Sequence, residues 1–161
     1  MNKFKFVVLI FISFVFLAVN GCKDDEEDLY AKEMETLKAY LLENNITTEP
    51  TSSGIYYIEE VDGTGREAEA GTIVNVNYRG YYVTGEEFDK SEEGEPLRFR
   101  LGVGQVIPGW DEGIDYMAEG GKATIIVPSD EAYGVDGYSP YIPAYTTLIF
   151  DVELILVEDD K

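Results

Sequence analysis

The side chains of this sequence that could do chemistry are mostly carboxylates and tyrosines. Its 161 residues include 32 Asp and Glu, 12 Lys and Arg, 12 Tyr, one Cys and no His. A Ser-His-Asp triad, a Cys-His pair and the usual zinc sites need histidine or several cysteines, so these chemistries are excluded. The net charge of −20 repels the phosphates of nucleic acid, so we expect no nucleic-acid partner.

Neighbouring carboxylates are the remaining candidates for acid–base work. The pairs Glu86–Glu87, Glu92–Glu93 and Asp111–Glu112 could suggest a glycosidase, but side chains adjacent in sequence rarely face one site. The chain has no calcium loop of the Asp-x-Asp-x-Asp-Gly type, and "GTGREAEAG" lacks the strand–helix context of a phosphate loop. We therefore expect neither a metal nor a cofactor.

The one tryptophan, Trp110, lies in a segment with helical spacing. Trp110, Ile114 and Met117 stand at i, i+4 and i+7, which predicts a short helix with one apolar face. Gly120 and Gly121 are expected to end this helix. By itself, Trp110 is either an ordinary core residue or the floor of a pocket.

Alternation of apolar and polar residues predicts five strands that would position this helix. The expected strands are "GIYYIEEV", "TIVNVNYRGYY", "LRFRL", "KATIIVP" and "TTLIFDVELILVE". In the last strand, one face should carry Leu148, Phe150, Val152, Leu154 and Leu156. The expected fold is α+β, an antiparallel sheet of about five strands wrapped around one short helix.

The N-terminus predicts export. Two lysines precede an apolar run from Phe6 to Val19, which is shorter than the roughly 20 residues of a membrane-spanning helix, so residues 1–21 are interpreted as a signal peptide. The following "VNGC" resembles a bacterial lipobox, which implies lipidation at Cys22 and a lipid anchor in a bacterial membrane of the cell envelope. The adjoining "KDD" resembles a surface-export signal, which extends the expectation to the outer membrane or cell surface.

Residues 22–53 are expected to join this anchor to the folded domain. The acidic run "KDDEEDLY" is interpreted as a solvated tether, because dense like charge resists collapse. An amphipathic helix is predicted from the spacing of Leu29, Tyr30, Glu33, Met34, Leu37, Tyr40 and Leu41. Docking on the chain's own domain is favoured for this helix over dimerisation, because four turns are few for an independent coiled coil. "TTEPTSSG" would be a linker, and the folded domain would span 54–161.

Four segments carry a family resemblance that covers roughly residues 54–158. They are "VNYRGYYVTGEEFDKS", "PLRFRLGVGQVIPGWDEGIDYM", "IIVPSDEAYG" and "YIPAYTTLIFDVELI", which resemble, in order, the motifs of FKBP-type peptidyl-prolyl cis-trans isomerases. "VIPGW" and "SSGIYY" are most similar to the exported bacterial branch. The resemblance implies an FKBP-like fold, peptidylprolyl isomerase activity that assists the folding of exported proteins, and proline-containing polypeptides as substrates. Macrolides are further implied ligands, and Leu97, which stands where the best-studied members carry an aromatic residue, bears on their affinity.

The resemblance also implies the site residues. The implied catalytic set is Tyr78, Phe88, Asp89, Trp110, Tyr133 and Phe150, and the implied substrate-binding set is Leu97, Phe99, Val106, Ile107, Tyr141 and Ile142. Trp110 would floor a proline pocket between aromatic walls, while the N–H of Ile107 and the hydroxyl of Tyr133 would hold substrate carbonyls. The alternative is a non-catalytic FKBP-fold binding or chaperone module on the cell envelope, because single aromatic residues in alternating strands are usually core residues.

Overall fold

The computed structural model describes residues 21–159. Its helices are α1 (Gly21–Glu43), α2 (Pro108–Asp115) and the short 3-10 turn η1 (Ser129–Glu131). Its strands are β1 (Tyr56–Val61), β2 (Ile73–Tyr82), β3 (Glu87–Lys90), β4 (Leu97–Arg100), β5 (Lys122–Val127) and β6 (Leu148–Glu158).

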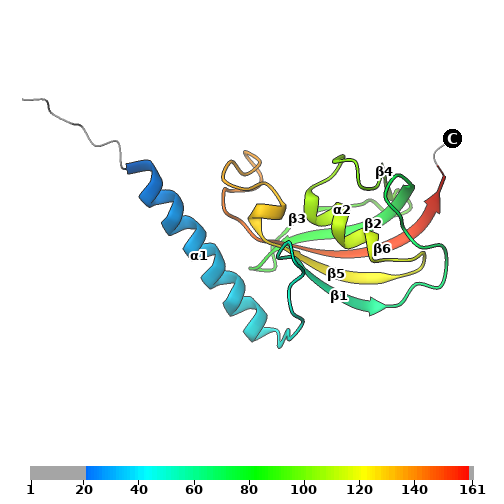
Figure 1. Ribbon diagram of the computed structural model, residues 1–161, viewed down its shortest axis with the longest axis horizontal. Coiled ribbons are helices and arrows are strands. Elements are labelled where there is room, and N and C mark those ends of the chain that lie inside the picture. The colour runs from blue at the N-terminus through cyan, green and yellow to red at the C-terminus, as the bar shows by residue number, and fades with distance from the viewer. Residues whose placement is uncertain (1–20, 160–161) are drawn as a thin grey trace, which may run out of the picture.

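The strands form one antiparallel sheet with α2 across one face and α1 at one end (Figure 1). The order is β1-β5-β6-β2-β3, and β4 pairs with the first part of β2. The α+β class and the antiparallel sheet are confirmed, and the sheet has six strands where about five were expected. The additional strand is β3, whose sequence "EFDK" is too short and too charged to show an apolar alternation, and which is defined by its pairing with Arg79 and Gly80 of β2.

The main core lies between the sheet and α2. Trp110, Ile114 and Met117 are exposed by only 3%, 0% and 3%, so the predicted apolar face of the helix is confirmed. The helix itself ends earlier than expected, at Asp115, and Gly120 with its φ of +82° belongs to the following turn. This placement fixes the one tryptophan against the middle of the sheet.

A β-bulge in β6 overturns one predicted position. Asn75 pairs with Leu156, but Val76 pairs with Leu154, so Ile155 is an extra residue on the β6 side. The bulge reverses the alternation beyond it. Leu156 is therefore 44% exposed, and Val157, at 5%, takes the inward position that the sequence pattern gave to Leu156.

Helix α1 begins at Gly21, so the acidic residues expected to form a loose tether are helical. The expectation of a tether over residues 23–30 is wrong. Negative side chains in the first turns of a helix are favoured by its dipole, and Glu has a high intrinsic helix propensity, so the same charges that oppose collapse favour this helix N-terminus. Residues 1–20 of the expected signal peptide lie outside the described range, as do the side chains of residues 21–25, Cys22 among them.

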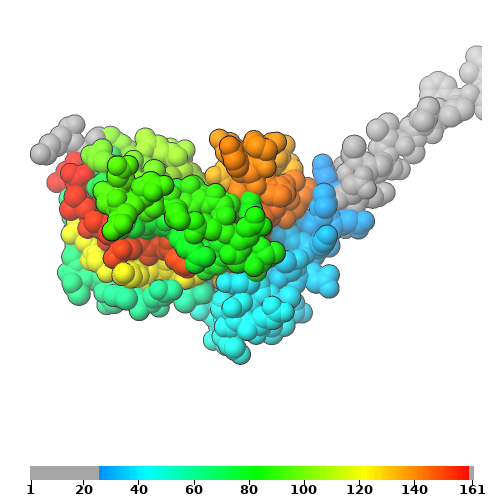
Figure 2. All heavy atoms as spheres, turned by 180° about the vertical axis from the view of Figure 1, so that it is seen from behind, coloured from blue at the N-terminus to red at the C-terminus, as the bar shows by residue number. Residues whose placement is uncertain are grey.

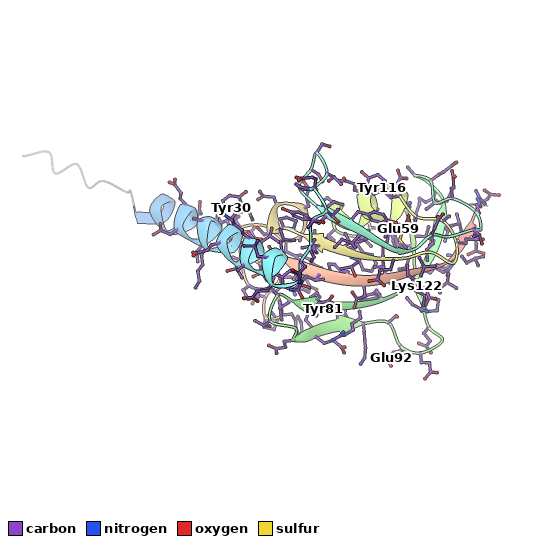
Figure 3. All side chains as sticks on the ribbon, turned by 90° about the horizontal axis from the view of Figure 1, so that it is seen from below. Tyr30, Glu59, Tyr81, Glu92, Tyr116 and Lys122 are labelled. Atoms are coloured by element: carbon purple, nitrogen blue, oxygen red, sulfur yellow. The ribbon has the colours of Figure 1, made fainter. Side chains whose placement is uncertain are left out.

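The docking of α1 on the chain's own domain is confirmed. Leu37 is 4% exposed and packs with Ile126 and Ile149, which lie on the face of β5 and β6 opposite the main core. Tyr81, on β2 close to the C-terminal end of α1 (Figure 3), belongs to the same cluster. Leu29, predicted on the apolar face, remains 47% exposed. Within residues 21–159, no helix combines the length and the apolar character needed to cross a membrane.

Candidate functional site

The pocket opens beside the N-terminus of α2. It has a volume of ≈ 170 Å³ and lies between the strands and the segment that follows η1. Its lining residues are Tyr78, Phe88, Asp89, Leu97, Gln105, Val106, Ile107, Trp110, Tyr133 and Phe150. In Figure 2 the surface dips between the light green atoms around α2 and the orange atoms of the segment after η1. Elements far apart in the sequence thus enclose one small hollow lined mainly by aromatic and aliphatic residues.

Trp110 lies at the bottom of this hollow and is held by aromatic rings. The rings of Tyr78 and Phe150 meet it edge-on at centroid distances of 5.0 Å and 5.2 Å. Its Nε1 is buried and has no hydrogen-bond partner among the described residues. Phe99 lies 6.0 Å from Trp110 and is 6% exposed, so it supports the indole from within the core. It was expected to bind substrate, but it is not among the residues that line the pocket.

The two aromatic walls depend on a glycine that the sequence analysis missed. Phe88 of β3 and Phe150 of β6 meet at 5.7 Å, almost perpendicular to each other. Gly80 of β2 lies beneath both, and a Cβ there would stand 2.7 Å from Phe88 Cζ and 3.0 Å from Phe150 Cε1. A glycine inside an alternating strand is a recognised sign of close approach by another group, and this signal was present in "NYRGYY".

Asp89 at the rim is occupied by hydrogen bonds. The Tyr78 hydroxyl donates to Asp89 Oδ2 at 2.7 Å, and the N–H of Lys90 donates to Oδ1 at 2.9 Å. Burial, followed by the hydrogen bond and the charge of Asp89, raises the pKa of Tyr78 well above its usual range. Tyr78 is therefore a neutral donor at physiological pH, and Asp89 serves as its acceptor.

The loop before α2 is fixed from both sides. Asp111 accepts the N–H of Gly102 through Oδ1 at 2.8 Å and the N–H of Gly104 through Oδ2 at 2.9 Å. Gln105 Oε1 accepts the N–H of Arg100 at 2.8 Å. These contacts set the backbone that leads to Val106 and Ile107. Gln105 lines the pocket and was missed, because no periodic pattern marks a loop residue.

A second hollow of ≈ 250 Å³ adjoins the first and shares its residues Phe88, Asp89 and Tyr133. The structure places Tyr141 and Ile142 here, on the overhanging segment, defined as residues 129–147. Tyr138 stacks on Tyr133 at 5.4 Å and on Tyr141 at 6.3 Å, which forms a row of three rings. Burial, with the neighbouring Tyr138 and Asp89, raises the pKa of Tyr133, so its hydroxyl is also a neutral donor.

A comparison with protein families identifies the family of this chain. Residues 64–155 match the family described as FKBP-type peptidyl-prolyl cis-trans isomerase. The chain belongs to this family. The FKBP fold and isomerase activity implied by the motifs are therefore confirmed.

Relatives with curated names agree. The FK506-binding protein of Neisseria meningitidis serogroup A is 46% identical over 106 residues, which cover 65% of this chain and 97% of that protein. FkpA of Escherichia coli K12, an FKBP-type peptidyl-prolyl cis-trans isomerase, is 41% identical over 135 residues, 83% of this chain and 48% of that protein. The Neisseria match shows common membership of the family, because it covers almost all of that protein, whereas the chain spans about half the length of FkpA.

Solved structures share the fold of this isomerase. The crystal structure of FkpA from Escherichia coli gives a TM-score of 0.73 at 38% identity and covers 86% of this chain and 63% of that one. A peptidyl-prolyl cis-trans isomerase from Pseudomonas syringae gives a TM-score of 0.72 at 32% identity over 83% of this chain and 96% of that one. Both coverages extend beyond the isomerase match itself.

Proposed function

We propose that the chain isomerises X-Pro bonds of exported polypeptides in the pocket floored by Trp110. The observation that supports this assignment is the row of aromatic walls around a buried indole, with the nearby hydroxyls held neutral. The pocket has room for a small ring such as that of proline. Proline-containing segments are the substrate class that fits.

The proposed mechanism depends on the shape of the pocket and on the exclusion of water from it. Rotation about an X-Pro bond is opposed by amide resonance, with a barrier of roughly 18–20 kcal/mol. A twisted amide has less charge separation than a planar one, so an apolar cavity favours it relative to water. Each tenfold acceleration corresponds to about 1.4 kcal/mol, so a thousandfold needs only about 4 kcal/mol of preferential binding. A few contacts to the twisted form are sufficient.

Each lining residue then has a role. Trp110 supports the pyrrolidine ring, and Phe88 and Phe150 hold it from the sides. The N–H of Ile107 and the hydroxyl of Tyr133 hold the carbonyls that flank the bond. Asp89 fixes Tyr78 at the rim through the 2.7 Å hydrogen bond and transfers no proton.

A protease-coupled assay on a proline tetrapeptide with the full chain tests this proposal. We expect catalysis and a change in Trp110 fluorescence that saturates with the same peptide concentration as the rate, because the indole would touch the bound proline. Turnover without any saturable fluorescence change would place the reaction elsewhere, and the absence of turnover would refute the activity for this chain.

Macrolide binding is proposed for the same pocket. Relatives of this chain are named FK506-binding proteins, and Leu97, 38% exposed, lines the mouth where a macrolide would lie. FK506 should therefore compete with the tetrapeptide. Inhibition that is not relieved by excess peptide would indicate a different binding site.

Anchoring to the cell envelope through lipid on Cys22 completes the proposal. It rests on "VNGC" and the apolar run before it, and it divides the chain into residues 1–21 as signal peptide, 22–53 as a helix followed by a linker, and 54–161 as isomerase domain. Stable attachment needs two or more acyl chains, which lipoprotein processing would supply. The outer membrane or cell surface is the proposed destination.

A further inference from the structure

A buried carboxylate joins α1 to the overhanging segment. Glu33 of α1 is 5% exposed, although it is a charged residue in the middle of a surface helix. Its Oε1 accepts the N–H of Ser129 at 2.8 Å and the hydroxyl of Thr147 at 2.8 Å, and its Oε2 accepts the hydroxyl of Ser129 at 2.5 Å. Ser129 and Thr147 are themselves buried, at 1% and 4%. Three donors therefore satisfy one carboxylate that is almost completely removed from water.

The two partners of Glu33 are the two ends of the overhanging segment. Ser129 begins the segment at η1, and Thr147 ends it immediately before β6. Figure 2 shows the segment (orange) seated against α1 (blue). One side chain from α1 thus closes the base of a loop whose tip carries Tyr138 and Tyr141 over the second hollow.

The contact continues by backbone hydrogen bonds to Tyr133. The carbonyl of Ser129 accepts the N–H of Ala132 at 2.9 Å and the N–H of Gly134 at 2.8 Å, the residues on either side of Tyr133. The carbonyl of Gly134 then accepts the N–H of Tyr145 at 3.0 Å, which ties the two arms of the segment together. Displacement of Ser129 would therefore move Tyr133, which lines both hollows.

Besides Glu33, α1 meets the overhanging segment through Tyr30, whose ring centroid lies 6.4 Å from that of Tyr145. A cavity of ≈ 380 Å³, lined by Leu29, Glu33 and Thr36 of α1, separates the helix from the strand end at Tyr82 and from the residues around Pro143. The apolar cluster of α1 lies farther along the helix, where Leu37 meets Ile126 and Ile149. The cluster keeps α1 docked, while Glu33 provides the polar link to the segment above the pocket.

We propose that Glu33 is a positioning residue for the isomerase: by joining Ser129 to Thr147 it holds the overhanging segment, and Tyr133 with it, in the substrate-binding arrangement. The inference rests on the proposed function of the pocket. It makes α1 a working part of the active site, although no residue of α1 lines either of the two hollows.

The test is steady-state kinetics of the full chain with a proline tetrapeptide. Glu33→Ala leaves the three donors unpaired and should raise KM by about 3- to 10-fold with kcat within about twofold, because a loosened segment weakens binding of substrate and transition state alike. A purely structural role would instead lower the folded fraction, which reduces apparent kcat and leaves KM unchanged. The matched control is Glu35→Ala, an exposed glutamate on the same helix with the same charge change, which should alter neither constant.

A conservative variant sharpens the test. In Glu33→Gln the side-chain oxygen can accept from the Ser129 N–H and from Thr147, while Nε2 can donate to Ser129 Oγ, so KM should return to within about twofold of the wild type. Glu33→Ala in a Tyr133→Phe background should raise KM by a smaller factor than in the wild type, because the two residues act through one segment.

Several results would overturn the inference. A folded Glu33→Ala with wild-type KM, a loss confined to kcat, or equal factors in both backgrounds would each do so. If Glu33→Ala does not accumulate as a folded protein, Ser129→Ala removes only the contact to Oε2, and its unchanged KM would count equally against the proposal. An inactive wild type would refute the proposed function, whereas an active wild type indifferent to Glu33 would refute only the positioning role.

Discussion

Phe88 is the wall residue whose removal separates catalysis from folding most cleanly. It is half-buried and contacts Phe150 at 5.7 Å and Tyr82 at 5.1 Å at the edge of the core. Phe88→Ala should lower kcat/KM by more than about tenfold while the chain stays folded, because the ring lines the pocket and is only half-buried. The control Tyr133→Phe removes one hydroxyl, worth roughly 0.5–1.5 kcal/mol, and should cost about tenfold or less. Full activity in both folded variants would contradict the pocket assignment.

Substitution of Gly80, which lies beneath Phe88 and Phe150, tests whether the spacing of these two rings matters for activity. In Gly80→Ala the new methyl group would meet Phe88 Cζ at 2.7 Å and Phe150 Cε1 at 3.0 Å, so at least one ring must shift. We expect kcat/KM to fall several-fold while the free energy of unfolding changes by no more than about 1 kcal/mol, since Ala suits a strand better than Gly and the half-buried ring can move. Kinetics combined with urea unfolding would check this. An unchanged kcat/KM would mean that the spacing of the walls is not critical.

The tyrosines define the alkaline limit of the enzyme. Burial raises the pKa of both Tyr78 and Tyr81, and the neighbouring carboxylates Asp89 and Asp151 raise it further. Folding therefore favours the protonated phenols, so their contribution to stability is complete below about pH 10 and is lost as the pH rises through the folded-state pKa values. Unfolding free energies from pH 8 to 11 should fall only above pH 10, and Tyr78→Phe should lessen that fall. A steep fall that begins below pH 9 would contradict it.

The same chemistry predicts a flat rate profile. No lining residue would exchange a proton with the substrate, so kcat/KM should vary little between about pH 6 and 9 while the fold holds. A bell-shaped profile in that range would reveal an acid–base pair outside the proposed mechanism.

At the scale of elements, the sequence predicted the helices and strands whose own residues show a regular apolar spacing. The spacing of Trp110 and Ile114 located α2, and the alternation of Val74 and Val76 located β2. The pocket residues were predicted through motif resemblance rather than spacing, because residues from β2, β3, β4, β6, α2 and two loops meet only in the folded chain.

The elements that were missed depend on partners distant in sequence. Strand β3 exists because β2 offers an edge to it, and the inward turn of Val157 follows from a bulge opposite Asn75 and Val76. Glu33 was expected on the packed face of its helix without a stated partner. Its buried role required Ser129 and Thr147, which are about a hundred residues away, and no pattern within the helix could name them.

Leu37 measures the strength of α1 docking. It is 4% exposed against Ile126 and Ile149, and truncation of a buried leucine typically costs about 2–5 kcal/mol. Leu37→Ala should therefore lower the free energy of unfolding by about 2 kcal/mol or more in urea, whereas Leu42→Ala, at a side chain 70% exposed on the same helix, should change it by less than about 0.5 kcal/mol. Equal effects of the two substitutions would mean that the docked helix does not stabilise the domain.

For the whole molecule, the proposed anchor makes location depend on one cysteine. The chain is acidic, and its charge would oppose adsorption to anionic headgroups, so the proposed membrane attachment would rest on lipid at Cys22. Cys22→Ser should move the protein from the detergent phase to the aqueous phase in a phase-partition experiment and should change its mature mass. Protease treatment of intact cells would then test surface display. Unchanged partitioning and mass would refute lipidation at Cys22.

The unbroken helix from Gly21 to Glu43 gives such an anchor a mechanical meaning. With a rise of about 1.5 Å per residue, the helical stretch from Cys22 to Glu33 spans roughly 17 Å and acts as a rigid spacer rather than a flexible linker. Because Glu33 and Leu37 fix this spacer to the domain, a lipid at its N-terminal end would hold the pocket at a set distance from the bilayer and restrict its movement. The isomerase would then reach only the nascent chains in a thin layer at the membrane surface. A flexible linker would let it reach a larger volume.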